Sequence, residues 1–141
     1  MALTLSFEGV SVSRDGRSIL SNIDWQVLDN QRWVIVGPNG AGKTTLLKVA
    51  AAQIQPSFGK AVILEETLGE TNVFDLRTRV GFASSALVAR IPNSETVLDA
   101  VMTASYAITG RWKEAYEDID ERRARRVLGE WNLAELADRA F

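Results

Sequence analysis

Eight residues, Gly37 to Thr44, have the types and spacing of a phosphate-binding loop. They read Gly-Pro-Asn-Gly-Ala-Gly-Lys-Thr, a complete G-x-x-x-x-G-K-[ST] pattern. Its three glycines let the backbone adopt conformations closed to residues with a Cβ atom, so consecutive N–H groups can turn toward one phosphate. Lys43 adds a positive charge near the β- and γ-phosphates, and the Thr44 hydroxyl is suited to Mg²⁺. With a chance occurrence on the order of 1% over this length, the pattern predicts a nucleotide-binding chain.

The segments on either side of the loop have the patterns that this chemistry requires. The apolar run at residues 33–36 precedes the loop and predicts a buried strand. Apolar residues recur at helical spacing in residues 43–51, so we expect a helix there with its positive end toward the phosphates. A strand before the loop and a helix after it are the setting in which such a loop binds phosphate.

Shorter patterns predict the remaining elements of the chain. Residues 3–8 alternate between apolar and polar side chains, as in a strand with one buried face. Two further extended segments follow a turn at Asp15-Gly16, so we expect a small antiparallel β region before the loop. These two segments are residues 18–20 and 23–27. The other expected elements are a strand at 60–64, one or two helical turns at 73–79, a short buried strand at 80–83, and helices at 96–107 and 112–131.

Length and composition restrict the chemistry further. The chain has 141 residues, of which 46% are hydrophobic and 24% charged, enough for one domain with a core. Sixteen basic and eighteen acidic side chains give a formal charge of −2, so there is no global field that attracts nucleic acid or an anionic membrane. Cysteine and histidine are both absent, which excludes disulfides, thiolate and imidazole metal ligands, and the usual general base near neutral pH.

Neither a signal peptide nor a membrane span is visible in the sequence. The first eight residues lack a basic flank and a continuous apolar stretch, and no apolar run approaches the ~18 residues that a span needs. We therefore expect a chain in the cytoplasm, whose contact with any membrane depends on a partner.

The basic run at residues 122–126 has acidic residues at the spacing of helical ion pairs. Asp118 and Glu121 each precede an arginine, Arg122 and Arg125, by four positions. This spacing favours a solvated helix face. Binding of the run to nucleic acid or to a coupling helix is the alternative, and nucleic acid is not the expected partner.

Taken together, these motifs resemble the amino-terminal half of the nucleotide-binding domain of the ATP-binding-cassette (ABC) ATPase family. Residues 10–13, 19–25 and 34–48 are similar to its opening strands and Walker A loop. Residues 54–59, 80–85 and 96–101 are similar to its P-x-x-G turn, the strand that ends in its Q-loop, and the start of its helical subdomain.

The resemblance implies an α/β P-loop NTPase fold of the ABC type and an incomplete domain. Residues 1–84 would be the antiparallel β region with part of the nucleotide-binding core, and residues 85–141 the start of the helical subdomain. In the family, the strands beside the P-loop strand come from the half that follows.

Two positions depart from the family pattern. Arg14 stands where the family usually has an aromatic residue that stacks on adenine. Its planar guanidinium can also stack on a base, or it is an exposed turn residue and shape alone holds adenine. Ser85, or Ser84 with a shift of one residue, stands in place of the Q-loop glutamine, and a serine hydroxyl reaches the metal only through water.

The expected nucleotide ligands are Gly37, Pro38, Asn39, Gly40, Ala41, Gly42, Lys43, Thr44, Thr45 and Arg14, and the expected Mg²⁺ ligands are Thr44 and Ser85.

The family's signature motif, Walker B aspartate, catalytic glutamate and switch histidine have no counterpart in these 141 residues. Hydrolysis needs carboxylates that orient water and hold the Mg²⁺ shell. We therefore expect this chain alone to bind ATP with Mg²⁺ and to hydrolyse little or none, and we assign no catalytic residue in it.

The resemblance implies the ATP-binding subunit of a transporter. Its partners would be a second ATP-binding domain, as a homodimer or pseudo-dimer, and transmembrane subunits that hold it at the inner face of the membrane. The alternatives are a soluble ABC ATPase that acts on ribosomes, RNA or DNA, and a non-hydrolysing fragment that only binds nucleotide or a partner. A P-loop kinase or GTPase fits poorly, because the β region precedes the loop and the chain has no N-K-x-D guanine motif.

Overall fold

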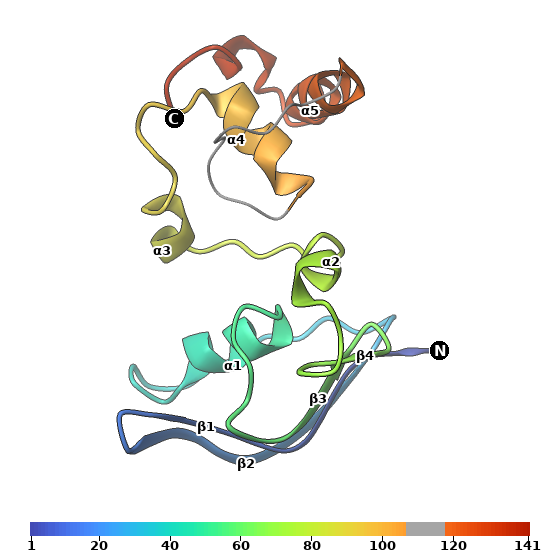
Figure 1. The fold of residues 1–141 in the computed structure, drawn as a ribbon, viewed down its shortest axis with the longest axis vertical. Helices are drawn as coiled ribbons and strands as arrows, with labels where there is room; N and C mark the ends of the chain where they lie inside the picture. Colours follow the sequence, from blue (N-terminus) through green and yellow to red (C-terminus); the bar gives the residue numbers. More distant parts are fainter. Residues whose placement is uncertain (107–117) are drawn as a thin grey trace. The chain divides into compact units, whose positions relative to one another are not determined.

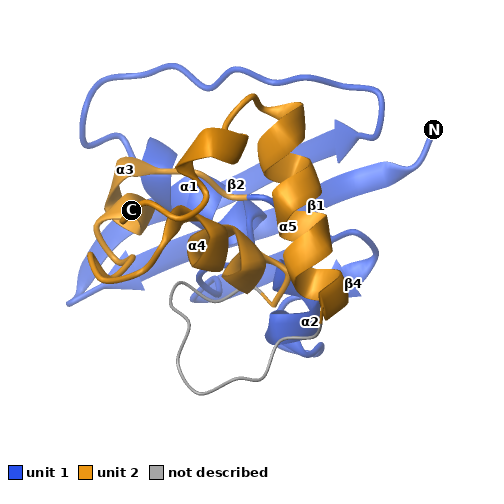
Figure 2. Cartoon of the chain, turned by 90° about the horizontal axis from the view of Figure 1, so that it is seen from above, with its two compact units in different colours: residues 1–81 blue, residues 82–141 orange. Residues whose placement is uncertain are grey.

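The computed structural model describes residues 1–106 and 118–141. They form two compact units, Met1–Gly81 and Phe82–Phe141 (Figure 2). The boundary expected from the sequence, between residues 84 and 85, lies just inside the second unit.

The first unit contains a four-stranded antiparallel sheet (Figure 1). Strands β1 (Leu3–Arg14) and β2 (Arg17–Leu28) form a long hairpin, and β3 (Phe58–Ile63) and β4 (Glu66–Thr67) extend the sheet in the order β2-β1-β3-β4. Asp15 and Gly16 both have positive φ angles, 52° and 73°, as in the two-residue turns that suit the twist of a hairpin. The antiparallel β region expected before the loop is therefore confirmed.

Helix α1 (Lys43–Ala50) lies over one face of this sheet (Figure 1). Phe7 and Val10 of β1 and Val49 of α1 are among the most deeply buried side chains of the unit. Leu5 and Phe7 belong to this core, as the alternation of residues 3–8 predicted. Leu3 is 44% exposed and Ser6 only 8% exposed, so the expectation that one face alone is buried is wrong for this strand. The sheet and the helix after the loop thus share one hydrophobic core.

Helix α2 (Val73–Arg77) follows β4 and begins at a side-chain cap. The Oδ1 atom of Asn72 accepts a hydrogen bond of 3.1 Å from the N–H group of Phe74, which satisfies one of the free donors at the start of the helix. Leu76 is buried in the core of the first unit. Short as it is, α2 is fixed to that core.

Two expected strands are wrong. Residues 33–36 and 80–83 have no strand structure, and Val34 and Val36 are each 85% exposed. No strand within residues 1–106 and 118–141 pairs with either segment, and an apolar run without a neighbouring strand has no ladder to hold it. Trp33 instead packs edge-to-face on Trp25, with the ring centroids 5.8 Å apart, beside an apolar hollow of about 360 Å³.

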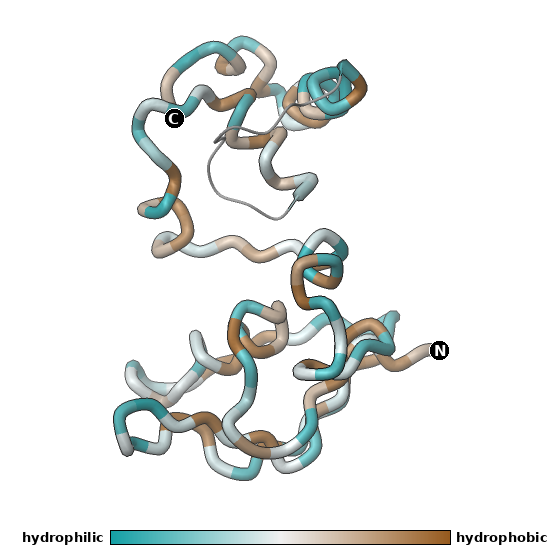
Figure 3. The backbone as a smooth tube through the Cα atoms, viewed as in Figure 1, coloured by the Kyte–Doolittle hydropathy of each residue, from teal (hydrophilic) through white to brown (hydrophobic). Residues whose placement is uncertain are grey.

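The second unit is helical in its described part, as expected. It contains α3 (Ser85–Val88), α4 (Val97–Ala104), α5 (Asp118–Glu130) and the short 3₁₀ helix η1 (Ala134–Leu136). Residue 107 and residues 112–117 of the expected helices lie outside the described residues. Figure 3 shows α5 as largely hydrophilic. Its few buried apolar residues join those of α4 and the following segment in a small core made of Leu98, Met102, Ala124, Leu128 and Ala137.

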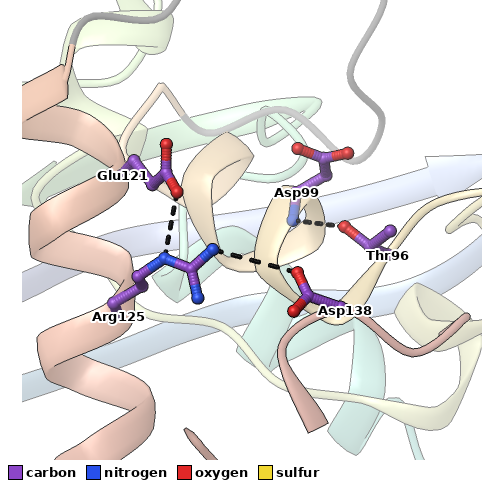
Figure 4. Close-up of polar contacts among 5 residues, drawn as sticks. All are labelled: Thr96, Asp99, Glu121, Arg125 and Asp138. Atoms are coloured by element: carbon purple, nitrogen blue, oxygen red, sulfur yellow. Dashed lines mark hydrogen bonds and ion pairs between the residues drawn. The ribbon is translucent and has the colours of Figure 1, made fainter.

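Polar side chains in the second unit cap α4 and form exposed ion pairs on α5 (Figure 4). The Oγ1 atom of Thr96 accepts a hydrogen bond of 3.1 Å from the N–H group of Asp99 and caps α4. Arg125 of α5 lies 3.0 Å from Glu121 and 3.8 Å from Asp138. The expected ion pair between residues 121 and 125 is thus present, on an exposed helix face.

Among the described helices, none combines the length and the apolar character needed to cross a bilayer.

Candidate functional site: the loop before helix α1

The loop at residues 37–42 leads directly into α1. Gly40 and Gly42 have φ angles of 83° and 99°, and Gly42 is the residue before the first helical position. Among the described residues no side chain caps this end of the helix, so the N–H groups of its first turn are available to a ligand. Free N–H groups and the positive end of the helix dipole together form a site for an anion such as phosphate.

Lys43 folds back over the loop. Its Nζ atom donates a hydrogen bond to the carbonyl oxygen of Gly37, and its Cδ atom lies 3.8 Å from the place that a Cβ at residue 37 would occupy. The ammonium group therefore lies at the residue that opens the loop. This places the full positive charge and the first-turn N–H groups of α1 on one short stretch of chain.

Thr44 and Thr45 occupy the first turn of α1, where Thr44 is exposed and Thr45 is partly buried. A threonine hydroxyl is a hard oxygen donor of the kind that Mg²⁺ prefers. Within residues 1–106 and 118–141 there is no cluster of three or more acidic side chains that could hold a metal. A cation at Thr44 would thus depend on phosphate oxygens and water for its other ligands, which fits the usual Mg²⁺–nucleotide site.

The start of β2 supports the base of the loop. A Cβ atom at Gly42 would lie 2.9 Å from Cδ2 of Leu20 and 3.0 Å from the carbonyl oxygen of Ile19. Leu20 is itself buried in the core of the first unit. The glycine at position 42 therefore allows both the left-handed backbone and the close approach of the loop to the sheet.

Arg14 lies at the tip of the β1–β2 hairpin and is exposed. The strand register places it directly opposite Arg17, which is exposed as well. Sequence reasoning singled out Arg14 and missed Arg17. The two-residue turn at Asp15-Gly16 was the signal that could have found it, because such a turn pairs the residues on either side of it.

Ser85 is the exposed first residue of α3, in the second unit. Its neighbour Ser84 caps that helix, and the Oγ atom of Ser84 accepts a hydrogen bond of 3.1 Å from the N–H group of Leu87. This bond gives Ser84 a structural role as the cap of α3. A role of Ser85 at the metal stays a prediction.

The geometry of loop, lysine and helix agrees with a comparison of the whole sequence with protein families. The model of the ABC transporter family matches residues 20–141. This chain belongs to that family. Curated proteins to which it is similar include ATP-binding components of ABC transporters. A putative ABC transporter ATP-binding protein from Streptococcus mutans is 34% identical over 128 residues, which are 91% of this chain and 48% of that protein.

A second curated relative is also an ABC transporter ATP-binding protein. The uncharacterized ABC transporter ATP-binding protein YlmA from Bacillus subtilis is 30% identical over 140 residues, or 99% of this chain and 53% of that protein. The chain spans about half the length of these two relatives.

Solved ABC structures share the fold. The ATP-binding cassette MJ0796, determined as a dimer bound to ADP and Pi, superposes with a TM-score of 0.75 at 18% identity, over 96% of this chain and 61% of that one. A nucleotide-free cassette from an ABC transporter also gives 0.75 at 18% identity, over 99% of this chain and 58% of that one. The ABC ATPase type of P-loop fold expected from the sequence is confirmed.

Proposed function

We propose that this chain is the amino-terminal part of the ATP-binding subunit of an ABC transporter and that it binds Mg-ATP at residues 37–45. The observation that carries the proposal is the position of Lys43. Its ammonium group donates to the carbonyl of Gly37 at the start of the loop, and no side chain in the described part of the chain caps the helix that follows. This concentration of donors and positive charge suits a polyphosphate.

Each part of the loop has its own task in this proposal. The backbone N–H groups of the loop and of the first turn of α1 hold the phosphates, and Lys43 compensates their charge. Thr44 contributes its hydroxyl to Mg²⁺, which neutralises the phosphate oxygens when it is bound. Gly42 keeps the loop seated on β2 so that these donors stay in place.

In the full-length protein, we propose that ATP hydrolysis drives transport and that the residues for hydrolysis lie outside this chain. The chain alone then binds ATP without turning it over. A second ATP-binding domain and transmembrane subunits are the proposed partners, with the protein at the inner face of the membrane. One solved relative is part of the ABC transporter complex cbiONQ, and MJ0796 forms a dimer, which supports these partners by similarity.

Isothermal titration with Mg-ATP tests the binding proposal. The native chain should bind, and Lys43→Ala should weaken binding by about tenfold or more, because hydrogen bonds to charged groups are worth about 1.5–3 kcal/mol. Lys48→Ala is the matched control, since it removes the same side chain from the last turn of the same helix. The proposal fails when the native chain shows no heat of binding or when the two variants bind equally well.

Ser85 favours a second candidate function, a soluble ABC ATPase that acts on ribosomes, RNA or DNA, because the usual glutamine is absent. Purification of the full-length protein under mild conditions separates the two. An integral membrane partner in the purified complex supports the transporter. Recovery of RNA or DNA without any membrane protein supports the soluble enzyme.

A further inference from the structure

One asparagine of the chain, Asn39, is followed directly by a glycine, Gly40, and this pair lies inside the phosphate loop. The other asparagines precede larger residues, namely isoleucine, glutamine, valine, serine and leucine. Asparagine is a chemically labile side chain, and it deamidates when the backbone nitrogen of the next residue reaches its amide carbon. A glycine has no Cβ atom to hinder that approach. The sequence thus places its most labile asparagine within the candidate anion site.

The structure leaves both reacting groups of this pair accessible. Asn39 and Gly40 are exposed. Within residues 1–106 and 118–141, neither the side-chain amide of Asn39 nor the N–H group of Gly40 forms a hydrogen bond. The N–H group of Ala41 donates a bond of 3.2 Å to the carbonyl oxygen of Pro38, so the pair forms the corner of a turn. No protein hydrogen bond in this part of the chain has to break before the two groups react.

The reaction needs no partner except water. The backbone nitrogen of Gly40 loses its proton and bonds to the Cγ atom of Asn39, the bond from Cγ to Nδ2 breaks, and Nδ2 leaves with that proton as ammonia. One water molecule then opens the resulting succinimide ring at either of its carbonyl groups, which gives aspartate or isoaspartate. No atom changes its oxidation state. The product carries a carboxyl group that is ionised at neutral pH.

The new charge would lie in a loop whose donors suit an anion. The first turn of α1 has no side-chain cap among the described residues, and Lys43 brings its ammonium group to the start of the loop. These groups favour a negative charge nearby. A carboxylate at residue 39 therefore competes with a phosphate for them and repels it. Isoaspartate also adds a methylene group to the backbone, which displaces the N–H groups that follow.

We propose that Asn39 and Gly40 form a site of spontaneous deamidation, and that the carboxylate produced there closes the loop to nucleoside polyphosphates. Nucleotide binding then becomes a property that the chain loses with age. Bound Mg-ATP protects the site, because a loop wrapped around phosphate cannot make the backbone movement that ring closure requires. The effect on binding rests on the proposed function, whereas the deamidation itself does not.

Tryptic peptide mapping after incubation in warm, mildly alkaline buffer tests the site. Trypsin cleaves after Arg32 and Lys43 and releases residues 33–43, in which Asn39 is the one asparagine. Mass spectrometry should show that Asn39 deamidates at least about tenfold faster than Asn30, which is exposed but precedes a glutamine. A rate for Asn39 no higher than that for Asn30 would overturn the inference, whether or not the chain binds nucleotide.

Titration of fresh and incubated chain with Mg-ATP tests the consequence for binding. The fraction of chain that binds should fall in step with the fraction of Asn39 converted, while circular dichroism stays unchanged. Saturating Mg-ATP during the incubation should slow the conversion of Asn39 at least about threefold and leave Asn30 unaffected. Asn39→Gln should keep the affinity of its own fresh sample, because its longer side chain closes a ring more slowly. An incubated native chain that is fully converted at Asn39 and binds like the fresh chain would contradict the proposal.

A pair of substitutions separates the new charge from the loss of the asparagine side chain. Asn39→Asp carries the charge of the product from the start and should bind Mg-ATP about tenfold more weakly than the neutral Asn39→Gln, because like charges this close repel each other. Equal affinities of the two variants would refute the inference and leave the proposed function intact. Absence of binding by the fresh native chain would refute the proposed function, and with it the effect on binding, even if Asn39 deamidates.

Discussion

The Nε atom of Arg77 donates a hydrogen bond of 2.8 Å to the carbonyl oxygen of Ala52. Its Nη2 atom donates a second bond of 3.2 Å to the carbonyl oxygen of Gln53. Both carbonyls lie just after α1, so a positive charge sits at the negative end of the helix whose other end forms the phosphate site. One side chain thus ties α2 to the helix that carries Lys43.

Replacement of this side chain should destabilise the first unit. Arg77→Met removes two hydrogen bonds from a charged donor and leaves two carbonyls without that partner, which should lower the free energy of unfolding by about 1.5–3 kcal/mol. Urea denaturation measures the change. Arg79→Met is the control, since Arg79 makes a 3.9 Å ion pair with Glu66 in which both side chains are about half exposed, and it should cost less than about 1 kcal/mol. Equal costs in the two variants would contradict the role of Arg77.

Two glycines of the loop should differ in their tolerance of a methyl group. Gly40→Ala meets no atom within 4 Å and should cost about 1–2 kcal/mol for the left-handed backbone alone. Gly42→Ala adds a contact of 2.9 Å with Leu20 and one of 3.0 Å with the backbone of Ile19, so it should cost at least about 1 kcal/mol more. Unfolding midpoints and Mg-ATP titration should rank the variants in the same order. A Gly42→Ala protein that is as stable as Gly40→Ala would show that the loop does not rest on β2.

The buried carboxylate of Asp120 in α5 depends on Tyr106 as one of its partners. The phenol hydroxyl lies 3.1–3.2 Å from both carboxylate oxygens, and Asp120 is only 5% exposed. Tyr106→Phe should therefore lower the free energy of unfolding of the second unit by about 1.5–3 kcal/mol. Asp138→Asn, at a side chain that is 88% exposed, is the comparison and should change it by less than about 0.5 kcal/mol. Guanidinium titrations followed by circular dichroism would measure both.

The exposed run at residues 33–36 should make this chain associate with itself. Several neighbouring apolar side chains in contact with water favour association. Val34→Lys should reduce association in light scattering and change the free energy of unfolding by no more than about 0.5 kcal/mol, because the site is 85% exposed. Ile63→Lys buries a charge in the core and should unfold the unit. If Val34→Lys unfolds the chain as well, residue 34 is buried in solution.

Local patterns predicted the parts of the site that lie within a few residues of one another. The spacing of Gly42, Lys43 and Thr44 located the loop, and the helical periodicity after it predicted α1 to within one residue of its end. Alternation in residues 3–8 predicted a strand there and the burial of Leu5 and Phe7, although Ser6 is buried as well. In each case the physical cause is local: the conformational freedom of glycine in the loop, or the spacing of apolar side chains along a helix or strand.

The wrong strands depend on contacts between distant segments, whereas the place of Arg17 depends on pairing across a local turn. The apolar run at residues 33–36 reads as a buried strand, but burial requires neighbouring strands, and the described residues provide none beside it. Arg17 gains its place opposite Arg14 from the register of the hairpin, which a search by family motif passes over. The presence or absence of a neighbouring strand, rather than the intrinsic preference of the residues, decided both the missing strands and the position of Arg17.

The last residues of the second unit are hydrogen-bonded to the segment at the start of α4. The N–H groups of Val97 and Leu98 donate to the carbonyls of Arg139 and Ala137, and the N–H group of Phe141 donates to Glu95. These backbone hydrogen bonds join the last residues of the chain to the start of α4 and close residues 95–141 into one loop of chain. Amide hydrogen exchange at residues 97, 98 and 141 would therefore report the opening of the whole unit, and these three amides should exchange together at one common rate.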